Sequence, residues 1–317
     1  MFGKTLRLGD RSDLVRNNWR DLIWWRDVAI SKLVQPLMEM RNHGTYILDE
    51  TWDSLIILDA CRYDTFAESI PYPGLRGRLE SRTSRATDTG EFLISNFLER
   101  KCDDVVYVSA NPFADKLIKD RVYKLISPWR THWDENQDTV LPEAMYRCTV
   151  QAARKYPDKR IVSHFIQPHY PYIGYDILNV SKFESAKPEW QQVKGGGYKD
   201  RSFFTMSAKL IYAKAMEDKA SHLRAYAHNL MRALPYVEKL AKSLPGRTIV
   251  TADHGEAFGE TISSLLPIKI YGHMPRMRIS ALTRVPWFVI EPKDKIVISN
   301  APAKRTSAQI TPWQAHQ

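Results

Sequence analysis

The sequence predicts an α/β protein whose mainly parallel sheet is flanked by helices on both faces, with a helical appendage at the N-terminus. Two observations predict this class. Short apolar runs rich in β-branched residues recur along the chain, and longer stretches with apolar residues at helical spacing separate them. Continuous apolar runs are typical of strands that are buried on both faces. The alternation of strands with helices favours a parallel sheet.

The composition restricts the class of partner. The 317 residues include 46 Lys and Arg against 36 Asp and Glu, a formal charge of +10 that favours anionic partners. The positive charge is dispersed along the chain and no nucleic-acid-binding motif is present. We therefore expect an anionic substrate, such as a phosphate or sulfate ester, and no nucleic acid.

Three features of the sequence bear on location. Residues 1–9 lack the apolar core of a signal peptide, and no apolar run approaches the ~20 residues that span a bilayer. The three cysteines form neither a zinc-ligand pattern nor a disulfide framework, which favours a reducing compartment. The expected location is the cytoplasm, with peripheral membrane association as an option.

The chain is expected to have three parts: an amphipathic helical segment (1–43), an α/β domain (44–300) and a loose C-terminal tail (301–317). In the first part, apolar residues at helical spacing and three tryptophans lie among eight Lys/Arg and five Asp/Glu. We favour a helix that packs on the domain or on a second copy of it in a homo-oligomer. The alternative is a helix on a membrane surface, through residues 1–43, where Trp and basic residues are favoured.

Within the domain, the order of elements follows from the patterns. Helices are expected at 91–100, 137–156 and 205–244, and Pro235 should kink the last one or start a new one. Residues 174–201 show little periodicity and form a lid, a binding loop or a disordered insertion. Strands are expected at 54–58, 104–109, 160–167, 247–250 and 284–290.

Polar residues follow two of these strands directly. Asp59 comes after the first, and Asp253 and His254 come after the strand at 247–250. Ligands of open α/β sheets bind beyond the carboxyl ends of the strands. A carboxylate there is costly unless it is paired or metal-bound, and carboxylate with imidazole is a common metal-ligand set. Asp-His-Gly alone is more often an ordinary polar turn, but the second carboxylate at a strand end favours a divalent metal site.

Two further groups are candidates for the same site. His169 follows the strand at 160–167, and His273 precedes the strand at 284–290, whereas His164 within its strand is either a site residue or a hydrogen-bonded core histidine. Hydroxyl residues precede the helix at 91–100, where one can serve as a nucleophile or simply cap the helix. The hydroxyl candidates are Thr83, Ser84, Thr87 and Thr89.

An ordered set of blocks resembles the sulfatase branch of the alkaline phosphatase superfamily. The residues 250–260 (VTADHGEAFGE) look like its metal-binding signature, and 58–64 (LDACRYD) resemble its first metal-ligand motif. The residues 164–172, 226–230 and Gly272-His273 followed by Val285-Pro286 are similar to further blocks. The likeness extends from Trp52 to about Pro292, and it implies an alkaline phosphatase-like fold.

The resemblance also implies roles for single residues. Asp59, Asp253 and His254 would bind one divalent ion, which could be Mn, Zn, Mg or Ca. His169 and His273 would hold the anionic group of the substrate or a second metal, and we place Arg62 and His164 with them as substrate-binding candidates. The family pattern places a Thr or Ser shortly before an aromatic-Leu pair that starts a helix, which favours Thr89 as nucleophile and Thr87 as runner-up.

One departure from the family pattern decides between chemistries. Sulfatases convert the Cys or Ser of a Cys/Ser-x-Pro-x-Arg motif to formylglycine, and none of the three cysteines here begins that motif. We therefore predict a metal-dependent phosphatase, phosphodiesterase or phospho-head-group transferase, with surface glycans or lipid-linked sugars as reasonable substrates. The alternatives are a sulfuric ester hydrolase and a non-catalytic binding protein of glycan assembly that kept the fold.

Overall fold

The fold is described from a computed structural model of the chain. The described residues are 19–20, 22–40, 43–70, 72–175 and 217–295. The predicted tail, most of the predicted insertion at 174–201 and the start of the predicted helix at 205–244 lie outside them. The division of the chain at residues 43 and 300 stays a prediction.

A seven-stranded sheet forms the centre of the described structure. Its strand order is β2-β11-β8-β1-β7-β3-β4, and all strands run parallel except β11, which is antiparallel to both of its neighbours. The mainly parallel sheet predicted from the apolar runs is therefore confirmed. In sheet order the strands are β2 (Arg78–Thr83), β11 (Arg284–Ile290), β8 (Thr248–Thr251), β1 (Ser54–Leu58), β7 (Arg160–Phe165), β3 (Cys102–Ser109) and β4 (Val122–Ile126).

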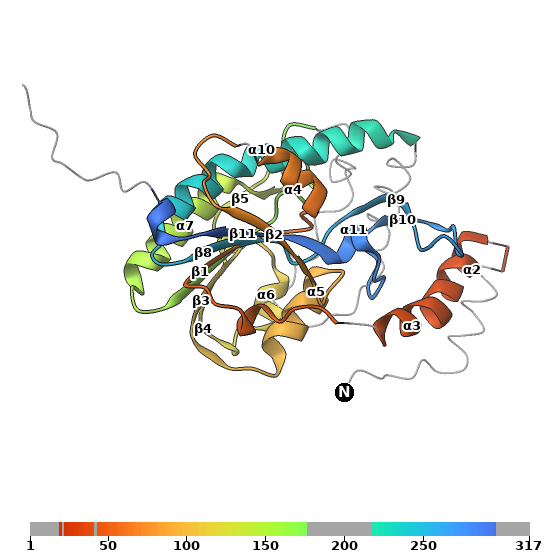
Figure 1. Cartoon of the computed structure of the whole chain (residues 1–317), viewed down its shortest axis with the longest axis horizontal. Helices are drawn as coiled ribbons and strands as arrows, with labels where there is room; N and C mark the ends of the chain where they lie inside the picture. Colours follow the sequence, from red (N-terminus) through yellow and green to blue (C-terminus); the bar gives the residue numbers. More distant parts are fainter. Residues whose placement is uncertain (1–18, 21, 41–42, 71, 176–216, 296–317) are drawn as a thin grey trace, which may run out of the picture.

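Helices cover both faces of the sheet, as predicted (Figure 1). Side chains of β1 alternate between two cores: Ile56 and Leu58 pack on one face, Leu55 and Ile57 on the other. The first face is covered by α4 (Tyr63–Ser69), α7 (Pro142–Lys155) and α10 (Lys219–Ser243). The second face is covered by α5 (Thr89–Leu93), the π-helical η3 (Ile94–Leu98) and α6 (Phe113–Leu117).

Three predicted helices differ in detail from the structure. Helix α10 continues through Pro235 without a break, because the buried neighbours Leu234 and Val237 hold it against the sheet. Helix α7 begins at Pro142 rather than near 137, since a short hairpin of β5 (Trp133–Asp134) and β6 (Thr139–Val140) precedes it. The helix predicted at 91–100 begins at Thr89 and changes to a π-helix at Ile94.

The N-terminal segment packs beside a hairpin that the sequence did not predict. The hairpin consists of β9 (Ala257–Thr261) and β10 (Lys269–Gly272), and the short α11 (Ser280–Thr283) follows it. Helix α2 (Leu22–Ala29), the π-helical η1 (Ile30–Val34) and α3 (Gln35–Glu39) place Ile30, Val34 and Met38 against it. The remaining short elements are the 3-10 helices η2 (Ile47–Asp49), η4 (Pro128–Arg130) and η6 (Pro292–Asp294). None of the described helices has the length and apolar character needed to cross a bilayer.

Candidate metal centre

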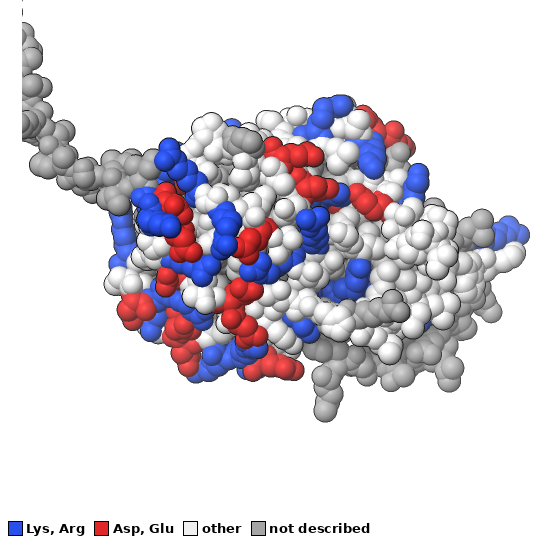
Figure 2. Space-filling view, in the orientation of Figure 1, with Lys and Arg blue, Asp and Glu red and all other residues white. Residues whose placement is uncertain are grey.

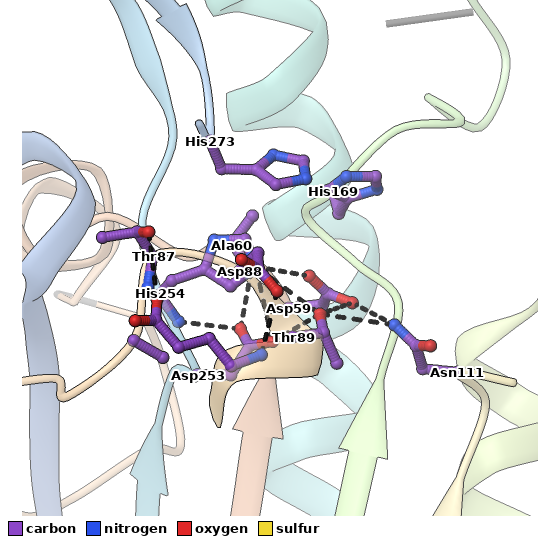
Figure 3. Close-up of polar contacts among 12 residues, drawn as sticks. Asp59, Ala60, Thr87, Asp88, Thr89, Asn111, His169, Asp253, His254 and His273 are labelled. Atoms are coloured by element: carbon purple, nitrogen blue, oxygen red, sulfur yellow. Dashed lines mark hydrogen bonds and ion pairs between the residues drawn. The ribbon is translucent and has the colours of Figure 1, made fainter. Parts of the chain in front are cut away.

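The three predicted metal ligands meet at the carboxyl edge of the sheet. β1 and β8 are hydrogen-bonded neighbours with Ile57 opposite Thr251, so the residues that follow them emerge side by side. Asp59, Asp253 and His254 are all buried, and their side chains point toward one another (Figure 3). The pairing of β1 with β8 therefore places Asp59 next to Asp253 and His254, which are nearly two hundred residues away in the sequence.

The Thr89 hydroxyl lies within this group. Thr89 Oγ1 donates a hydrogen bond to Asp253 Oδ2 at 2.7 Å and lies 3.3 Å from Asp59 Oδ2 and 3.5 Å from His254 Nε2. His254 Nε2 is also 3.5 Å from Asp59 Oδ1 and from Asp253 Oδ2. Ligand atoms bound tetrahedrally at a zinc-type distance lie about 3.3 Å apart. The spacing of these oxygen and nitrogen atoms fits a single divalent ion.

The tautomer of His254 supports the same conclusion. His254 Nδ1 is 2.8 Å from the carbonyl oxygen of Gly255, which can only accept, so Nδ1 holds the proton. In the neutral imidazole the lone pair is then on Nε2, which faces the two carboxylates. A histidine held in this way by a backbone carbonyl is the usual arrangement for a metal ligand. Gly255 is needed for the close approach of this turn to α11, since a Cβ there would lie 2.1 Å from Ala281 O.

The two carboxylates have opposite electrostatic environments. Burial and the neighbouring charge of Asp253 raise the pKa of Asp59 to about 6. Burial also opposes ionisation of Asp253, but His254 and His164 outweigh it, so the pKa of Asp253 lies below its usual range. Asp253 Oδ1 accepts the backbone N–H groups of Ala60 and His254, whereas the buried Asp59 Oδ1 has no hydrogen-bond partner. An unpaired buried carboxylate oxygen aimed at an imidazole lone pair is the feature that a bound cation would satisfy.

The backbone at this point is strained. Ala60, directly after Asp59, has φ of 58° in the left-handed region, which costs a non-glycine residue of order 1 kcal/mol or more. Its N–H contributes to the Asp253 contact, and its carbonyl accepts the Tyr226 hydroxyl at 2.6 Å. The strained turn therefore fixes the direction of the Asp59 side chain.

Asn111 belongs to the centre, although the sequence analysis did not single it out. Its Nδ2 donates to Asp59 Oδ2 at 2.9 Å and lies 3.4 Å from Thr89 Oγ1. Asn111 lies two residues beyond the end of β3, so the strand-end rule that selected Asp59 could have selected it too. Its Oδ1 accepts the N–H of Phe113, which orients the amide.

His164 adjoins the centre from within the sheet. It is fully buried on β7, its Nε2 is 3.6 Å from Asp253 Oδ2, and its Nδ1 is 2.8 Å from the Tyr107 hydroxyl. His164 therefore lies against a metal-ligand candidate. With Asp59 and Asp253 it also forms a group whose possible metal-ligand atoms all lie within 4.8 Å of one another, and substrate contact by His164 stays a prediction.

A second group lies next to the first. His169, Glu256 and His273 offer ligand atoms within 4.8 Å of one another, and the His273 ring is 4.8 Å from that of His254 and 4.9 Å from that of His169. Figure 3 shows His169 and His273 together on one side of the carboxylates. The predicted pair of histidines is therefore adjacent in the fold, and Glu256 is an addition that the sequence analysis did not name.

The second group contains one charged and one neutral histidine. Burial disfavours the His273 imidazolium, but Glu256, 3.1 Å from its Nδ1, outweighs burial and raises the pKa of His273 to about 9. Burial and the charge of His273 lower the pKa of His169. Burial would raise the pKa of Glu256, but His273 lowers it overall. A cationic and a neutral imidazole side by side can receive the oxygens of an anionic ester.

Two predicted site residues point elsewhere. Arg62 binds Asp64 and Glu260 at 2.5 Å each and also donates to the carbonyl of Glu256, so its guanidinium is occupied by the protein. Thr87 Oγ1 is 3.1 Å from Glu91 Oε2 and from the carbonyl of Met274, away from the carboxylates. Substrate contact by Arg62 stays a prediction, and of the two threonines only Thr89 faces the centre.

The comparisons with known proteins give distant structural likenesses. No protein-family model matches the chain, and no curated protein matches it. Among solved structures, it is similar to the C-terminal periplasmic domain of phosphoethanolamine transferase EptC from Campylobacter jejuni, with 13% identity, a TM-score of 0.45 and coverage of 76% of this chain and 79% of that one. It is also similar to the soluble domain of lipooligosaccharide phosphoethanolamine transferase A from Neisseria meningitidis, with 13% identity, a TM-score of 0.43 and coverage of 74% and 75%.

A third likeness is to the integral membrane protein EptA from Neisseria meningitidis, with 13% identity, a TM-score of 0.47 and 90% of this chain covered. The chain spans 59% of that protein's length. These descriptions name transferases of phosphoethanolamine and no sulfatase, so the sulfatase branch is not confirmed.

The cytoplasmic location that we expected is corrected by the same findings. The similar structures are described as periplasmic domains or as an integral membrane protein. Free cysteines do not by themselves indicate a reducing compartment. Cys61, Cys102 and Cys148 are all buried and free, and burial raises the pKa of the Cys61 thiol, so these thiols need no reducing compartment to stay reduced.

Proposed function

We propose that this protein is a metal-dependent phosphoryl-transfer enzyme that acts on a phosphate ester, with Thr89 as its nucleophile. The observation that supports this most is the position of Thr89 Oγ1, which lies 2.7 Å from Asp253, 3.3 Å from Asp59 and 3.5 Å from His254. The proposal includes phosphatases, phosphodiesterases and transferases of a phospho head group. In this proposal Asp59, Asp253 and His254 would hold one ion tightly, and His169 and His273 would serve the substrate.

A divalent ion held by Asp59, Asp253 and His254 would lower the pKa of the Thr89 hydroxyl and would neutralise charge on the phosphoryl oxygens. Asp253 Oδ2 already accepts the hydroxyl hydrogen of Thr89, and Asn111 orients the Asp59 carboxylate beside it. Thr89 Oγ1 attacks phosphorus as the bond to the leaving oxygen breaks, which gives a phosphothreonine. The His273 imidazolium holds the anionic oxygens during this step. Attack by water or by an acceptor alcohol then releases the phosphoryl group and restores Thr89.

The alternatives receive less support from the same geometry. A sulfuric ester hydrolase of the formylglycine type needs a modified Cys or Ser in its motif, and the residue that faces the carboxylates here is a threonine. A non-catalytic binding protein would be favoured if the hydroxyl stretch pointed away from the carboxylates. Thr89 points toward them, which supports the enzyme.

A pair of matched variants tests the proposal. Thr89→Ala should lower turnover by about three orders of magnitude or more in a metal-supplemented screen of phosphomonoesters, phosphodiesters and sulfate esters, because the nucleophile is lost. Thr89→Ser should keep part of the activity, and Thr87→Ala, two residues away, should keep most of it. A folded Thr89→Ala protein with near-normal turnover would reject Thr89 as nucleophile. Phosphate trapped on Thr89 after rapid acid quenching, located by mass spectrometry, would be the direct positive result.

A further inference from the structure

The loop that follows β7 carries His169 and is poor in backbone hydrogen-bond donors. Residues 168–173 form no helix or strand, and both prolines among them, Pro168 and Pro171, are buried and have no N–H. A buried carbonyl oxygen without a donor costs free energy. The carbonyl groups of this loop therefore depend on a donor from another element.

The side chain of Asn229, on α10, supplies that donor. It is fully buried, and its Nδ2 donates to the carbonyl oxygens of Pro168, His169 and Pro171 at 3.0–3.1 Å. Its Oδ1 accepts the N–H of Ile173 at 3.2 Å. Both the donor group and the acceptor of the amide are thus directed at the same loop. One side chain holds the main chain on both sides of His169.

The loop held in this way places His169 at the edge of the metal centre. The N–H of His169 donates to the carbonyl oxygen of Asp59 at 3.1 Å. Nδ1 of the ring is 2.5 Å from the carbonyl oxygen of Tyr170, so Nδ1 holds the proton and Nε2 of the neutral ring carries the lone pair. The centre of the ring is 4.9 Å from that of His273. The position of the imidazole is therefore set by the main chain that Asn229 holds.

Helix α10 holds the turn after β1 as well. The hydroxyl of Tyr226 donates to the carbonyl oxygen of Ala60 at 2.6 Å and accepts the N–H of Arg62 at 2.9 Å. Tyr226 and Asn229 are three residues apart and so lie on one face of the helix. This face of α10 therefore fixes the His169 loop relative to the predicted metal ligands.

The binding of an anion depends on such local placement. On the face of the molecule that Figure 2 shows, Lys and Arg are mixed with Asp and Glu over the described residues, so the surface there does not concentrate charge of one sign. Selection of an anionic group then depends on the imidazoles of the site. A displacement of about 1 Å in a group that orients the substrate can lower a rate about a hundredfold.

We propose that Asn229 is a positioning residue that acts through His169: it fixes the loop so that the imidazole contacts the anionic group of the substrate. The inference rests on the proposed function, in which His169 serves the substrate. The four hydrogen bonds of the Asn229 side chain all end on residues 168–173. They hold the loop of the site and no other part of the described structure.

A second buried amide shows the contrast and gives a matched control. Asn96 is 1% exposed; its Oδ1 accepts the N–H of Ile47, and its Nδ2 donates to the carbonyl oxygen of Phe92. These bonds join elements of the core on the other face of the sheet. Replacement of either asparagine by alanine removes a buried amide, but only Asn229 holds the His169 loop.

Inorganic phosphate is the probe for the anion site. Calorimetry of the full-length protein with Mn²⁺ present should show that Asn229→Ala raises the Kd for phosphate by about tenfold or more. Asn96→Ala should change this Kd by less than about twofold. Asn229→Asp keeps an acceptor for Ile173 but has no N–H to donate, so it should also raise the Kd and serves if Asn229→Ala does not fold.

A double-mutant cycle tests whether Asn229 acts through His169. His169→Gln should itself raise the Kd for phosphate, and in that background Asn229→Ala should add less than about a twofold change. Elemental analysis should give the same metal content in Asn229→Ala as in the wild type, because the three predicted metal ligands are unchanged. Peptides that cover residues 167–175 should exchange amide hydrogens faster in Asn229→Ala, since the N–H of Ile173 has lost its acceptor.

Four outcomes would overturn the proposal: no phosphate binding by the wild type, wild-type phosphate affinity in folded Asn229→Ala, an equal effect of Asn229→Ala with and without His169, or a loss of metal together with phosphate. Phosphate binding that depends on Asn229 in a protein that turns over no ester would support the positioning role and reject the proposed function. Normal turnover and phosphate affinity in Asn229→Ala would reject the positioning role and leave the proposed function standing.

Discussion

Asp253 is the residue whose replacement should most directly remove the metal. Its Oδ2 faces His254 Nε2 and Thr89 Oγ1, and it stays ionised although it is buried. Asp253→Asn removes one negative ligand and leaves Asp59 as the only carboxylate among the three predicted metal ligands. We expect metal affinity to fall by about a hundredfold or more.

Elemental analysis after equilibrium dialysis measures this, with Asp103→Asn as the control, because Asp103 is an exposed carboxylate paired with Lys101. Metal content that is unchanged in Asp253→Asn would reject the assigned site.

His273 should make the stability of the metal-free protein depend on pH. Glu256 raises the pKa of His273 in the folded state to about 9, whereas an unfolded histidine titrates near 6.5. A raised folded pKa means that the stabilisation is complete below pH 6.5 and is lost as the pH rises through about 9. The expected loss in the free energy of unfolding is about 2 kcal/mol, after allowance for partial exposure of the ring.

Urea unfolding at pH 6.5 and 9 measures this difference. In His273→Gln the part of the pH dependence of unfolding that comes from His273 should disappear. His228 is exposed, so His228→Gln should keep the pH dependence of the wild type. Because the pKa of His169 is lowered, His169 changes the free energy of unfolding only below about pH 6.5, outside the range from pH 6.5 to 9. A slope that is the same in His273→Gln and in the wild type would contradict the assignment of the imidazolium.

The Arg278 side chain links helix α5 to the N-terminal segment. Its two carboxylate partners should contribute differently to the free energy of unfolding. Arg278 is nearly buried; Glu91 is mostly buried, whereas Glu39 is substantially exposed. Arg278→Met leaves the buried Glu91 without its cation, so the free energy of unfolding should fall by about 2–4 kcal/mol. Glu39→Gln removes only the exposed partner and should cost less than about 1 kcal/mol.

Denaturant titration at neutral pH gives both values. If Glu39→Gln cost as much as Arg278→Met, the pair with Glu39 would be the main link rather than the pair with Glu91.

The elements that the sequence predicted are those with a uniform environment. Strands β1, β7 and β8 are buried along almost their whole length, so their apolar runs were sufficient to place them. The β9–β10 hairpin was missed because its two strands are short and have no regular pattern of burial, and because β9 includes Gly259 with φ of 97°. The start of α7 was misplaced because the short β5–β6 hairpin has no pattern of its own.

The site follows the same division. Asp59, Asp253 and His254 could be predicted, because the end of a buried strand fixes where its next residues go. Asn111 follows the same rule, but a neutral amide at a strand end is a weaker indication of a site than a carboxylate, because its burial costs less. The directions of Arg62 and Thr87 depend on partners distant in sequence, Glu260 and Met274, which no local pattern reveals.

At the scale of the molecule, charged side chains lie close together at the carboxyl edge of the sheet, and the rest of the fold must offset the free energy that their burial costs. Parallel neighbours β8, β1, β7 and β3 all end there, so Asp253, Asp59, His169 and Asn111 converge by topology alone. The apolar cores on both faces of the sheet exclude water from the side of the edge that adjoins the strands. The fold therefore keeps the carboxylates together whether or not a cation neutralises them. The free energy of unfolding should then depend on whether a cation is bound.

Metal removal should destabilise the whole domain, and one substitution should reverse part of that effect. A ligand at a hundred times its dissociation constant stabilises the folded state by about 2.7 kcal/mol, so a chelator should lower the melting temperature of the wild type. In the metal-free protein the pKa of Asp59 is raised to about 6. A carboxyl whose folded pKa exceeds its unfolded value binds more protons when folded, so its contribution becomes unfavourable as the pH rises from about 4 through 6, and it is fully unfavourable at pH 7.

Asp59→Asn removes that buried charge and can keep the contacts with Asn111 and Thr89 through its amide group. Without metal, this variant should therefore unfold at a higher temperature than the wild type, by the equivalent of about 1–3 kcal/mol. With metal the order should invert, because the variant has lost a ligand. Thermal unfolding with and without chelator at pH 7 measures all four states, with Asp103→Asn as the control for removal of a carboxylate elsewhere. A metal-free Asp59→Asn protein less stable than the metal-free wild type would mean that the two carboxylates are compensated within the protein itself, and that the fold does not need a cation at this edge.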